Sequence, residues 1–312
     1  MENSNGKHLA ICGNMVFQIS GDRSAIYIHN KYSVGNVEGK TIFLKPYEAI
    51  YLYLRNRIEP LNGVFKSQIS LMGSILEEDD MHRLKAYLEL KEEGTRINIE
   101  KDFFYVVRKS EKQSQRRKVV PVRENEKISF QWLMDISGGN VASVDDDGDV
   151  TYYKLNFVNI SGKNRIEILH GVDPVRIGNR AIARQEDVPE WMGDRIGSLS
   201  FLSEQETHII TGEGKKTEAA LIYEDLVKRG MIVKTGFKYG CTFRAYEESL
   251  ENHSEFLLHV TGQNMEWYEI SRAVRVAGAV KKRMVLASIF KDEPKYIEIK
   301  RIKSVGEFNI SD

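Results

Sequence analysis

Apolar and polar residues recur with regular spacing through the later part of the chain. The segment 215–229 predicts a helix, because its apolar residues recur at helical intervals: Ala219, Ala220, Tyr223, Leu226 and Val227. Gly230 follows at a position where a left-handed helix-ending residue is favoured. MIVKT and CTFRAY then predict two strands, joined by a turn around Gly236 and Gly240.

The same change between helical and strand spacing of the apolar residues continues towards the C-terminus. SEFLLHVT predicts a short, largely apolar strand, which His253 opens. Helical spacing returns over 267–283, and MVLASI and KYIEIKRI predict two final strands. Together these elements predict a small mixed sheet flanked by helices.

Three blocks of the chain occur twice in the same order, which favours an internal duplication. Residues 87–108 align with 223–244 without a gap, and Gly94 falls on Gly230. The further pairs of blocks are 39–52 with 197–210, and 140–158 with 284–302. The predicted fold class is therefore α+β (mixed α/β), with two tandem repeats over 1–159 and 160–312. Each repeat is an irregular α/β segment followed by a small mixed sheet flanked by helices, and the core of the second repeat is expected at about 215–312.

Composition adds limits to this picture. The chain has 312 residues, 41% hydrophobic and 29% charged, as expected for a globular protein of two domains. No apolar run approaches the roughly 20 residues of a membrane span, and MENSNGKHLA lacks the pattern of a signal peptide, so a cytoplasmic protein is expected. Cys12 and Cys241 are then expected to be free thiols. Because the formal net charge is zero, a nucleic-acid partner would have to be held by local basic clusters.

One such cluster consists of Arg272, Arg275 and Lys282 on the last predicted helix. Arg275 and Lys282 are seven residues apart, about two turns, and should share a face. Two interpretations stay open for this face. It is either a solvated basic surface or a stripe that contacts phosphate groups.

Tyr246 and His253 form a second candidate group, because only six residues separate them. Taken singly, a strand tyrosine is usually packing and a histidine at a strand edge is usually a surface residue. Adjacent strands could nevertheless bring both side chains to one end of the sheet. A phenol, an imidazole and the ammonium of Lys282 near one phosphate would form an acid/base set.

FKYGCTFRAY, HSEFLLHV and RVAGAVKKRMVLASI, in this order, resemble the catalytic repeat of the archaeal tRNA-splicing (tRNA-intron) endonucleases. The duplicated arrangement is similar to the form in which two chains make a homodimer. The resemblance implies excision of introns from precursor tRNA at bulge–helix–bulge elements. It further implies 2′,3′-cyclic phosphate and 5′-hydroxyl ends, with no metal and no cofactor, and a catalytic triad of Tyr246, His253 and Lys282.

The resemblance also gives each residue a role. Tyr246 would be the base for the attacking 2′-hydroxyl, and nearby Lys282 would favour its phenolate form. His253 would protonate the departing 5′-oxygen, while Lys282 would offset charge on the phosphoryl oxygens. Arg275 would stack on a bulge base, and Arg301 is the candidate for a second stacking arginine.

The first repeat lacks these groups, so it is expected to be non-catalytic. The alignment sets Ser110 against Tyr246, Ser137 against Lys282 and Phe130 against Arg275. The repeat carries an acidic loop at 144–150, VDDDGDV, which the resemblance implies docks on the partner chain through four carboxylates: Asp145, Asp146, Asp147 and Asp149. The alternative for this loop is a solvated hairpin turn.

Two further functions stay open at this point. The first is a non-catalytic RNA-binding or architectural subunit of the same fold. The second is a metal-dependent DNA nuclease, for which Glu298 and Lys300 supply an E-x-K pattern. Such a nuclease needs clustered carboxylates to hold its metal, and the sequence offers no convincing partner for Glu298.

Overall fold

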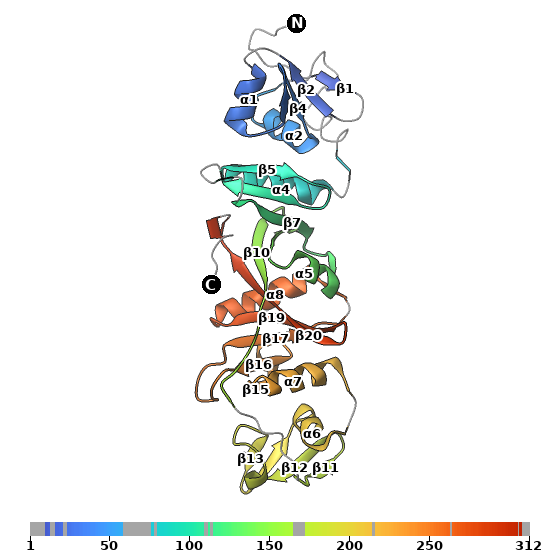
Figure 1. Cartoon of the computed structure of the whole chain (residues 1–312), viewed down its shortest axis with the longest axis vertical. Coiled ribbons are helices and arrows are strands. Elements are labelled where there is room, and N and C mark those ends of the chain that lie inside the picture. The colour runs from blue at the N-terminus through green and yellow to red at the C-terminus, as the bar shows by residue number, and fades with distance from the viewer. Residues whose placement is uncertain are drawn as a thin grey trace. The chain divides into compact units, whose positions relative to one another are not determined.

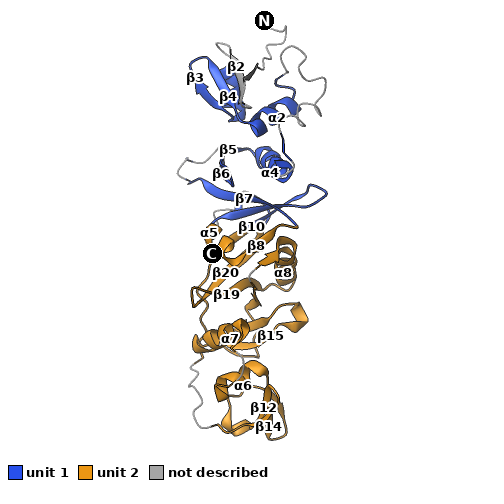
Figure 2. Ribbon diagram, turned by 90° about the vertical axis from the view of Figure 1, so that its right-hand side faces the viewer, with its two compact units in different colours: residues 1–124, 139–153, 302–312 blue, residues 125–138, 154–301 orange. Residues whose placement is uncertain are grey.

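The computed structural model describes most of the chain in several stretches. These are residues 10–12, 16–20, 24–58, 76–77, 80–108, 112, 115–164, 172–213, 216–262, 264–304 and 306–307. Ser110, which the alignment sets against Tyr246, lies outside them. Two compact units share the chain (Figure 2): unit 1 comprises 1–124, 139–153 and 302–312, and unit 2 comprises 125–138 and 154–301. Among the described helices, none is long and apolar enough to cross a membrane.

Unit 1 contains two sheets (Figure 1). The first has the order β1-β2-β4-β3 and the second the order β10-β9-β7-β6-β5, in which β7 and β9 run parallel. β10 continues into unit 2 from residue 154. The bounds are β1 Ala10–Cys12, β2 Val16–Ser20, α1 Ser24–Tyr32, β3 Asn36–Glu38, β4 Thr41–Leu44, α2 Pro46–Leu54, α4 Met81–Glu92, β5 Thr95–Ile99, β6 Phe104–Arg108, β7 Arg117–Arg123, β9 Asn140–Val144 and β10 Val150–Phe157.

Unit 2 also contains two main sheets, ordered β11-β12-β14-β13 and β15-β16-β17-β19-β20, and β17 and β19 are the parallel pair. The mixed α+β class predicted from the sequence is thereby confirmed. The bounds are β8 Lys127–Ser129, α5 Phe130–Ile136, β11 Val175–Ile177, β12 Arg180–Arg184, η4 Gln185–Asp187, β13 Asp194–Ile196, β14 Leu199–Leu202, α6 Glu204–Thr211, α7 Glu218–Lys228, β15 Ile232–Thr235, η5 Phe237–Tyr239, β16 Phe243–Tyr246, β17 Phe256–Val260, β18 Asn264–Glu266, α8 Trp267–Ala279, β19 Arg283–Phe290 and β20 Glu293–Ile302.

Helix α7 packs on the larger sheet of unit 2 through an aromatic contact. The ring centroids of Tyr223 and Phe243 lie 5.6 Å apart, and both side chains belong to a continuous buried cluster. Gly230 ends this helical segment with φ +82°, as the sequence predicts, and Gly94 follows α4 with φ +76°. The strands that follow each helix therefore leave it by the same kind of left-handed turn.

A buried carboxylate organises the smaller α/β segment of each unit. In unit 1, Glu48 at the third position of α2 accepts hydrogen bonds from the backbone N–H groups of Gly35 and Lys45, each at 2.8 Å. In unit 2, Glu206 of α6 accepts from the N–H groups of Gly193, at 3.0 Å, and Ser203, at 2.8 Å. The two segments thus share their local construction, although descent from one duplicated repeat stays an interpretation.

The gapless alignment of 87–108 with 223–244 is wrong beyond the hairpin turn. The turn between β5 and β6 occupies 100–103, whereas the turn between β15 and β16 occupies 236–242 and is longer. When the strand pairs are superposed from β5 and β15, the counterpart of Tyr246 is Val107 rather than Ser110. Val107 is buried and has no ionisable group, so unit 1 still lacks the phenol.

The alignment around the last helix needs a similar correction. Helix α5 has 7 residues and α8 has 13, and Phe130 and Trp267 are their first residues. Phe130 therefore matches Trp267 and not Arg275. The match of Ser137 with Lys282 is supported by the strand registers. Phe104 leads through Val119 to Asn140 in unit 1, as Phe243 leads through Leu258 to Val285 in unit 2. Three residues before Asn140 and Val285 stand Ser137 and Lys282.

Segment 125–138 packs with unit 2, although the expected first repeat includes it. Strand β8 pairs with β18 in an antiparallel ladder. The Trp132 and Trp267 rings lie 6.4 Å apart in an edge arrangement. These contacts join the two short helices α5 and α8 inside one unit, while the repeat boundary at 159/160 stays a prediction about sequence.

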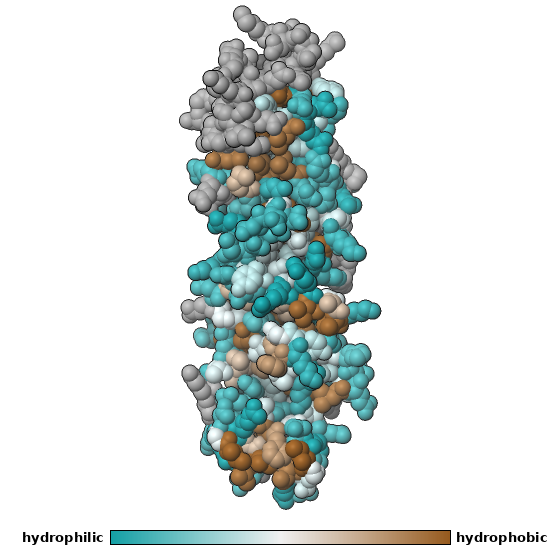
Figure 3. All heavy atoms as spheres, turned by 180° about the vertical axis from the view of Figure 1, so that it is seen from behind, coloured by the Kyte–Doolittle hydropathy of each residue, from teal (hydrophilic) through white to brown (hydrophobic). Residues whose placement is uncertain are grey.

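The sheet β11-β12-β14-β13 has unlike faces. Ala181, Ala183 and Leu202 point into a small buried cluster. On the other side, exposed apolar side chains come from three strands, and the lower end of Figure 3 shows brown surface there: Val175, Ile177, Ile196, Leu199 and Phe201. Unit 2 therefore presents an uncovered apolar sheet face within the described residues.

Candidate active site

Three neighbouring strands of unit 2 bring the predicted triad to one edge of the sheet. β16 ends at Tyr246 and runs antiparallel to β17, where Ala245 pairs with Phe256. β17 runs parallel to β19, where Phe256 pairs with Arg283. The end of β16 and the starts of β17 and β19 therefore coincide. Tyr246, the loop that carries His253, and Lys282 all adjoin this edge.

Hydrogen bonds hold the connecting loops against one another at this edge. Lys282 Nζ donates to the carbonyl oxygen of Ser254 at 2.6 Å, immediately after His253 in the chain. The backbone N–H of Arg283 donates to the oxygen of Glu255 at 3.0 Å. The amine of Lys282 is thereby fixed beside the loop that carries the imidazole.

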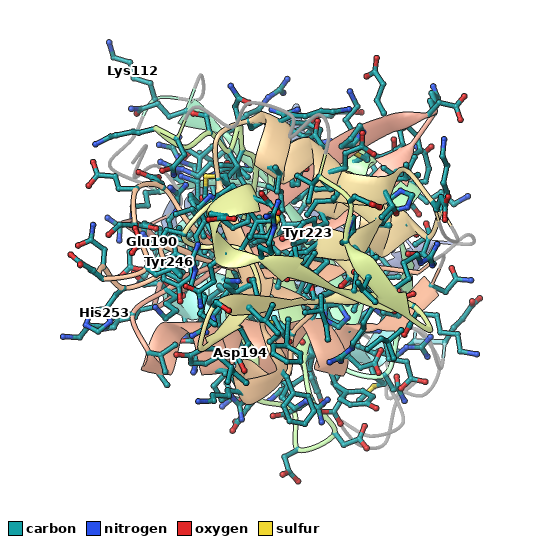
Figure 4. The ribbon with its side chains drawn as sticks, turned by 90° about the horizontal axis from the view of Figure 1, so that it is seen from below. Lys112, Glu190, Asp194, Tyr223, Tyr246 and His253 are labelled. Atoms are coloured by element: carbon teal, nitrogen blue, oxygen red, sulfur yellow. The ribbon has the colours of Figure 1, made fainter. Side chains whose placement is uncertain are left out.

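His253 itself is exposed and lies in the loop before β17. The prediction that His253 opens the strand is wrong, because the ladder begins only at Phe256. Figure 4 shows His253 at the periphery of the molecule and Tyr246 further inside. An imidazole in this position is accessible to a large substrate.

The prediction that Lys282 and Arg275 share a helical face is also wrong. Helix α8 ends at Ala279, and Lys281 adopts a left-handed φ of +55°. The N–H groups of Lys281 and Lys282 donate to the oxygens of Gly278 and Ala277, which is the bonding of a Schellman turn. This turn directs residue 282 away from the helix and towards the start of β19.

The two candidate stacking arginines occupy exposed positions. Arg275 lies on α8, whose buried side chains are Trp267, Ile270, Val274 and Ala277. Arg301 is the penultimate residue of β20 and is also exposed. Arg272, the third member of the basic cluster, is exposed on α8. All three guanidinium groups are therefore open to an external partner.

The phenol of Tyr246 is held in its protonated form. Its side chain is buried, and this burial raises the pKa above the ordinary value. The positive charge of Arg244 opposes the rise, and its guanidinium lies 5.7 Å from the Tyr246 ring centre. Tyr239 and Glu255 raise the pKa further.

Lys282 was expected to favour the phenolate of Tyr246, and this expectation is wrong for the structure as described. The cation that lowers the phenol pKa is Arg244. Lys282 Nζ instead binds the Ser254 carbonyl and lies 6.0 Å from the ring centre of Tyr239. The contacts of the Lys282 amine are therefore with the Ser254 carbonyl and the Tyr239 ring.

Arg244 and Tyr239 are site residues that the sequence reasoning missed. The signal for Arg244 was present in FRAY, because strand alternation sets residues 244 and 246 on one face while Phe243 and Ala245 enter the core. Arg244 Nε is buried without a hydrogen-bond partner. No comparable signal marked Tyr239, which lies in the 3-10 turn η5 before Gly240.

The acidic loop of unit 1 forms a tight turn between β9 and β10. Asp145 accepts a hydrogen bond from the N–H of Asp149 through its carboxylate at 2.8 Å, and Gly148 adopts a φ of +85°. Asp146, Asp147 and Asp149 are exposed. The turn therefore presents a concentrated negative charge.

Glu298, the residue of the alternative metal site, is already engaged. Its two carboxylate oxygens accept from Arg283 Nε at 2.8 Å and from the terminal nitrogen Nη2 at 2.6 Å. Within the part of the chain that the structure describes, no three His, Cys, Asp or Glu side chains group to hold a metal ion. The bidentate ion pair gives Glu298 a structural partner.

Comparison with known proteins decides the family. The model of the tRNA intron endonuclease catalytic C-terminal domain matches residues 217–298. A tRNA-splicing endonuclease of Thermoplasma volcanium is 34% identical over 95% of this chain and 98% of its own length. The chain belongs to the tRNA-splicing endonuclease family. A second relative of that name, from Picrophilus torridus, is 32% identical over 93% of this chain and 95% of its own length.

Membership of the tRNA-splicing endonuclease family makes the chain an enzyme. The matched catalytic domain begins at the start of α7 and ends within β20, so Tyr246, His253 and Lys282 all lie inside it. A shorter match to the tRNA-splicing endonuclease of Thermococcus kodakarensis, 38% identical, covers 27% of this chain and 51% of that protein.

Proposed function

We propose that this chain excises introns from precursor tRNA in the cytoplasm, by cutting RNA at bulge–helix–bulge sites without a metal ion. The names of the relatives support the tRNA substrate. The observation that carries the proposed chemistry is the meeting of three strand ends in unit 2, which brings Tyr246, the His253 loop and Lys282 to one edge.

The reaction we propose is a transfer within the RNA. Tyr246, in the small fraction of molecules where it is phenolate, takes the proton of the 2′-hydroxyl, and the freed 2′-oxygen attacks the adjacent phosphorus. The bond from phosphorus to the 5′-oxygen breaks, and that oxygen takes a proton from His253. The products are a 2′,3′-cyclic phosphate and a 5′-hydroxyl.

The surroundings of each group suit these roles. Lys282 carries a fixed positive charge, held by the Ser254 carbonyl, beside the place where the phosphoryl oxygens become more negative. Arg244 limits the rise in the Tyr246 pKa, which keeps proton abstraction within reach. His253 is exposed, so it can meet the leaving oxygen of a folded RNA.

Recognition of the bulged RNA is assigned to Arg275 and Arg301. A guanidinium plane stacks on an unpaired base, and both side chains are exposed. We further propose that two chains form a homodimer and that the acidic turn of unit 1 docks on the partner chain. The exposed Asp146, Asp147 and Asp149 support this role.

A metal-free cleavage assay tests the reaction. The chain is incubated with a precursor tRNA that carries a bulge–helix–bulge intron, in excess chelator, and the fragment ends are analysed. We expect full cleavage, 5′ ends that accept phosphate from a polynucleotide kinase without prior dephosphorylation, and cyclic phosphates at the 3′ ends. Loss of cleavage in chelator, or 5′-phosphate ends, would contradict the mechanism.

A further inference from the structure

Unit 1 carries a basic and aromatic surface formed by the strands β6 and β7 and by the residue that precedes each of them. Phe103 and Tyr105 lie with ring centres 5.0 Å apart and nearly perpendicular planes. The Arg116 guanidinium lies 4.4 Å from the centre of the Tyr105 ring, and Lys118 Nζ lies 4.7 Å from that of Phe103. We call these four residues the stacking surface of unit 1.

Strand pairing sets this surface on the face of the sheet opposite to Phe104 and Val106. Phe104 and Val106 are fully buried and point into the core of unit 1. Tyr105 points the other way and pairs with Asn98 on one side and Lys118 on the other. Because side chains alternate along a strand, the aromatic and basic groups gather on one side of the sheet, where Phe103, Tyr105 and Lys118 are half-buried and Arg116 is exposed.

A polar cavity of about 520 Å³ adjoins the stacking surface inside unit 1. Its walls include Tyr105, Asn98, Arg96 and Lys45, and the buried carboxylate of Glu48 lies at its lining. The volume is in the range of small-ligand sites, and the lining offers both donors and acceptors. A nucleobase with its edge groups fits such a space.

Comparison with unit 2 shows why unit 1 has this cavity. In unit 2, Lys234 pairs across the hairpin with Arg244, and its Nζ lies 2.9 Å from the carboxylate of Glu206. In unit 1 the corresponding cross-strand pair is Asn98 and Tyr105. The shorter, neutral Asn98 does not reach the carboxylate as Lys234 does, and its Nδ2 donates to Glu100 instead, at 2.7 Å.

We propose that the stacking surface and the adjoining cavity of unit 1 bind an unpaired nucleotide of RNA. The base enters the cavity against the Tyr105 ring, and the phosphates that flank it contact Arg116 and Lys118. Aromatic rings beside cations are what single-stranded nucleic acid requires, since each base offers a face for stacking and each phosphate a charge. This inference rests on the proposed function only in naming RNA as the ligand, and it assigns unit 1 a binding site of its own.

Direct binding measurements test the site. The full chain is titrated with a fluorescein-labelled oligouridylate and with the bulged precursor tRNA, and dissociation constants are measured at several salt concentrations. We expect Tyr105→Ala together with Arg116→Ala to weaken oligouridylate binding about tenfold or more. We also expect the slope of log affinity against log salt to fall by about 0.7 for the lost phosphate contact.

Two variants serve as controls. Tyr105→Phe keeps the ring and should bind as the unchanged chain does, which separates stacking from any damage to the fold. Arg180→Ala removes one positive charge from an exposed position on unit 2 and should leave the affinity unchanged. Crosslinking with 5-iodouridine should attach the RNA at Phe103 or Tyr105, as read by mass spectrometry.

Each outcome distinguishes this inference from the proposed function. If the unchanged chain cuts precursor tRNA while the double variant binds oligouridylate equally well, the inference is overturned and the function stands. If the unchanged chain does not cut but the double variant loses binding, the function fails and the site stands. If the double variant alters sedimentation and not RNA affinity, the surface serves protein contact and the inference is overturned.

Discussion

At the scale of single residues, the phenol of Tyr246 and the imidazole of His253 differ in their access to water. Tyr246 is buried and its pKa is raised, whereas His253 lies in an exposed loop. A base that is mostly protonated abstracts protons only in its minor form. The proposed mechanism therefore predicts both which residue can be removed and how the rate depends on pH.

Replacing His253 by Ala should reduce cleavage by about a hundredfold or more, because the leaving oxygen loses its proton donor. Binding of the precursor should change little, since the loop is held by Lys282 and not by the imidazole. Single-turnover cleavage and gel-shift titration of the same variant provide the check. Cleavage at the unchanged rate would rule out His253 as the acid.

The pH dependence gives a second prediction. Below the raised pKa of Tyr246, the phenolate fraction grows about tenfold per pH unit. In His253→Ala the phenol remains as the proposed base, so the residual cleavage rate should rise steadily with pH up to that raised pKa. A flat profile for this variant would contradict Tyr246 as the base.

At the scale of elements, the turn after α8 that positions Lys282 contains a residue with an unfavourable backbone conformation. Lys281 has a φ of +55°, a region where side chains other than glycine are strained. Lys281→Gly should therefore stabilise unit 2 by about 1 kcal/mol. Thermal unfolding measures the gain, and Asp292→Gly, at φ +64° in the β19–β20 hairpin, provides a matched variant away from the proposed site. A lower unfolding temperature for Lys281→Gly than for the unchanged chain would contradict backbone strain at residue 281.

Glu48 and Glu206 hold corresponding positions in the two units, yet they predict opposite changes of stability with pH. Burial raises the pKa of Glu48, so its contribution weakens as pH rises from the ordinary value of a carboxyl group through the raised one. Burial also acts on Glu206, but the charge of Lys234 and the hydrogen bonds it accepts lower its pKa overall. Its stabilisation is present above the ordinary value and is lost as pH falls towards the lowered one.

Unfolding followed separately in each unit across the acid range checks these signs. Glu48→Gln should remove the decline of stability with pH in unit 1. Lys234→Met should destabilise unit 2 by about 3 kcal/mol at neutral pH, since it leaves a buried charge without its partner. Identical acid profiles for the unchanged chain and both variants would contradict the assignment.

Much of unit 2 follows from its sequence, and the exceptions have physical causes. The helix before Gly230 and the strand ending at Tyr246 were predictable. The spacing of the apolar residues and the positions of the glycines indicated the same elements and the same ends. The end of α8 was not, because a lysine and not a glycine occupies the left-handed position. The gapless alignment of the two halves failed at the hairpin turns. The length of a turn does not change the alternation of side chains in the strands on either side, so the sequence pattern did not reveal the longer turn in unit 2.

At the scale of the whole molecule, the proposed homodimer depends on the acidic turn of unit 1. Changing Asp145, Asp146, Asp147 and Asp149 to Asn removes its charge without changing side-chain size. The dimer should dissociate more readily and cleavage should fall at low protein concentration, because docking loses its electrostatic attraction. Sedimentation velocity and cleavage over a range of concentrations measure both effects. Unchanged values for both would count against docking by this turn.

The Lys282 anchor has one further consequence. Its acceptor is a main-chain oxygen at position 254, and every amino acid supplies that atom. Random mutagenesis of this codon should therefore yield many active enzymes, restricted mainly by the small buried space around the native serine. Codon 282 should tolerate almost nothing, so two positions joined by one hydrogen bond would drift at very different speeds during evolution.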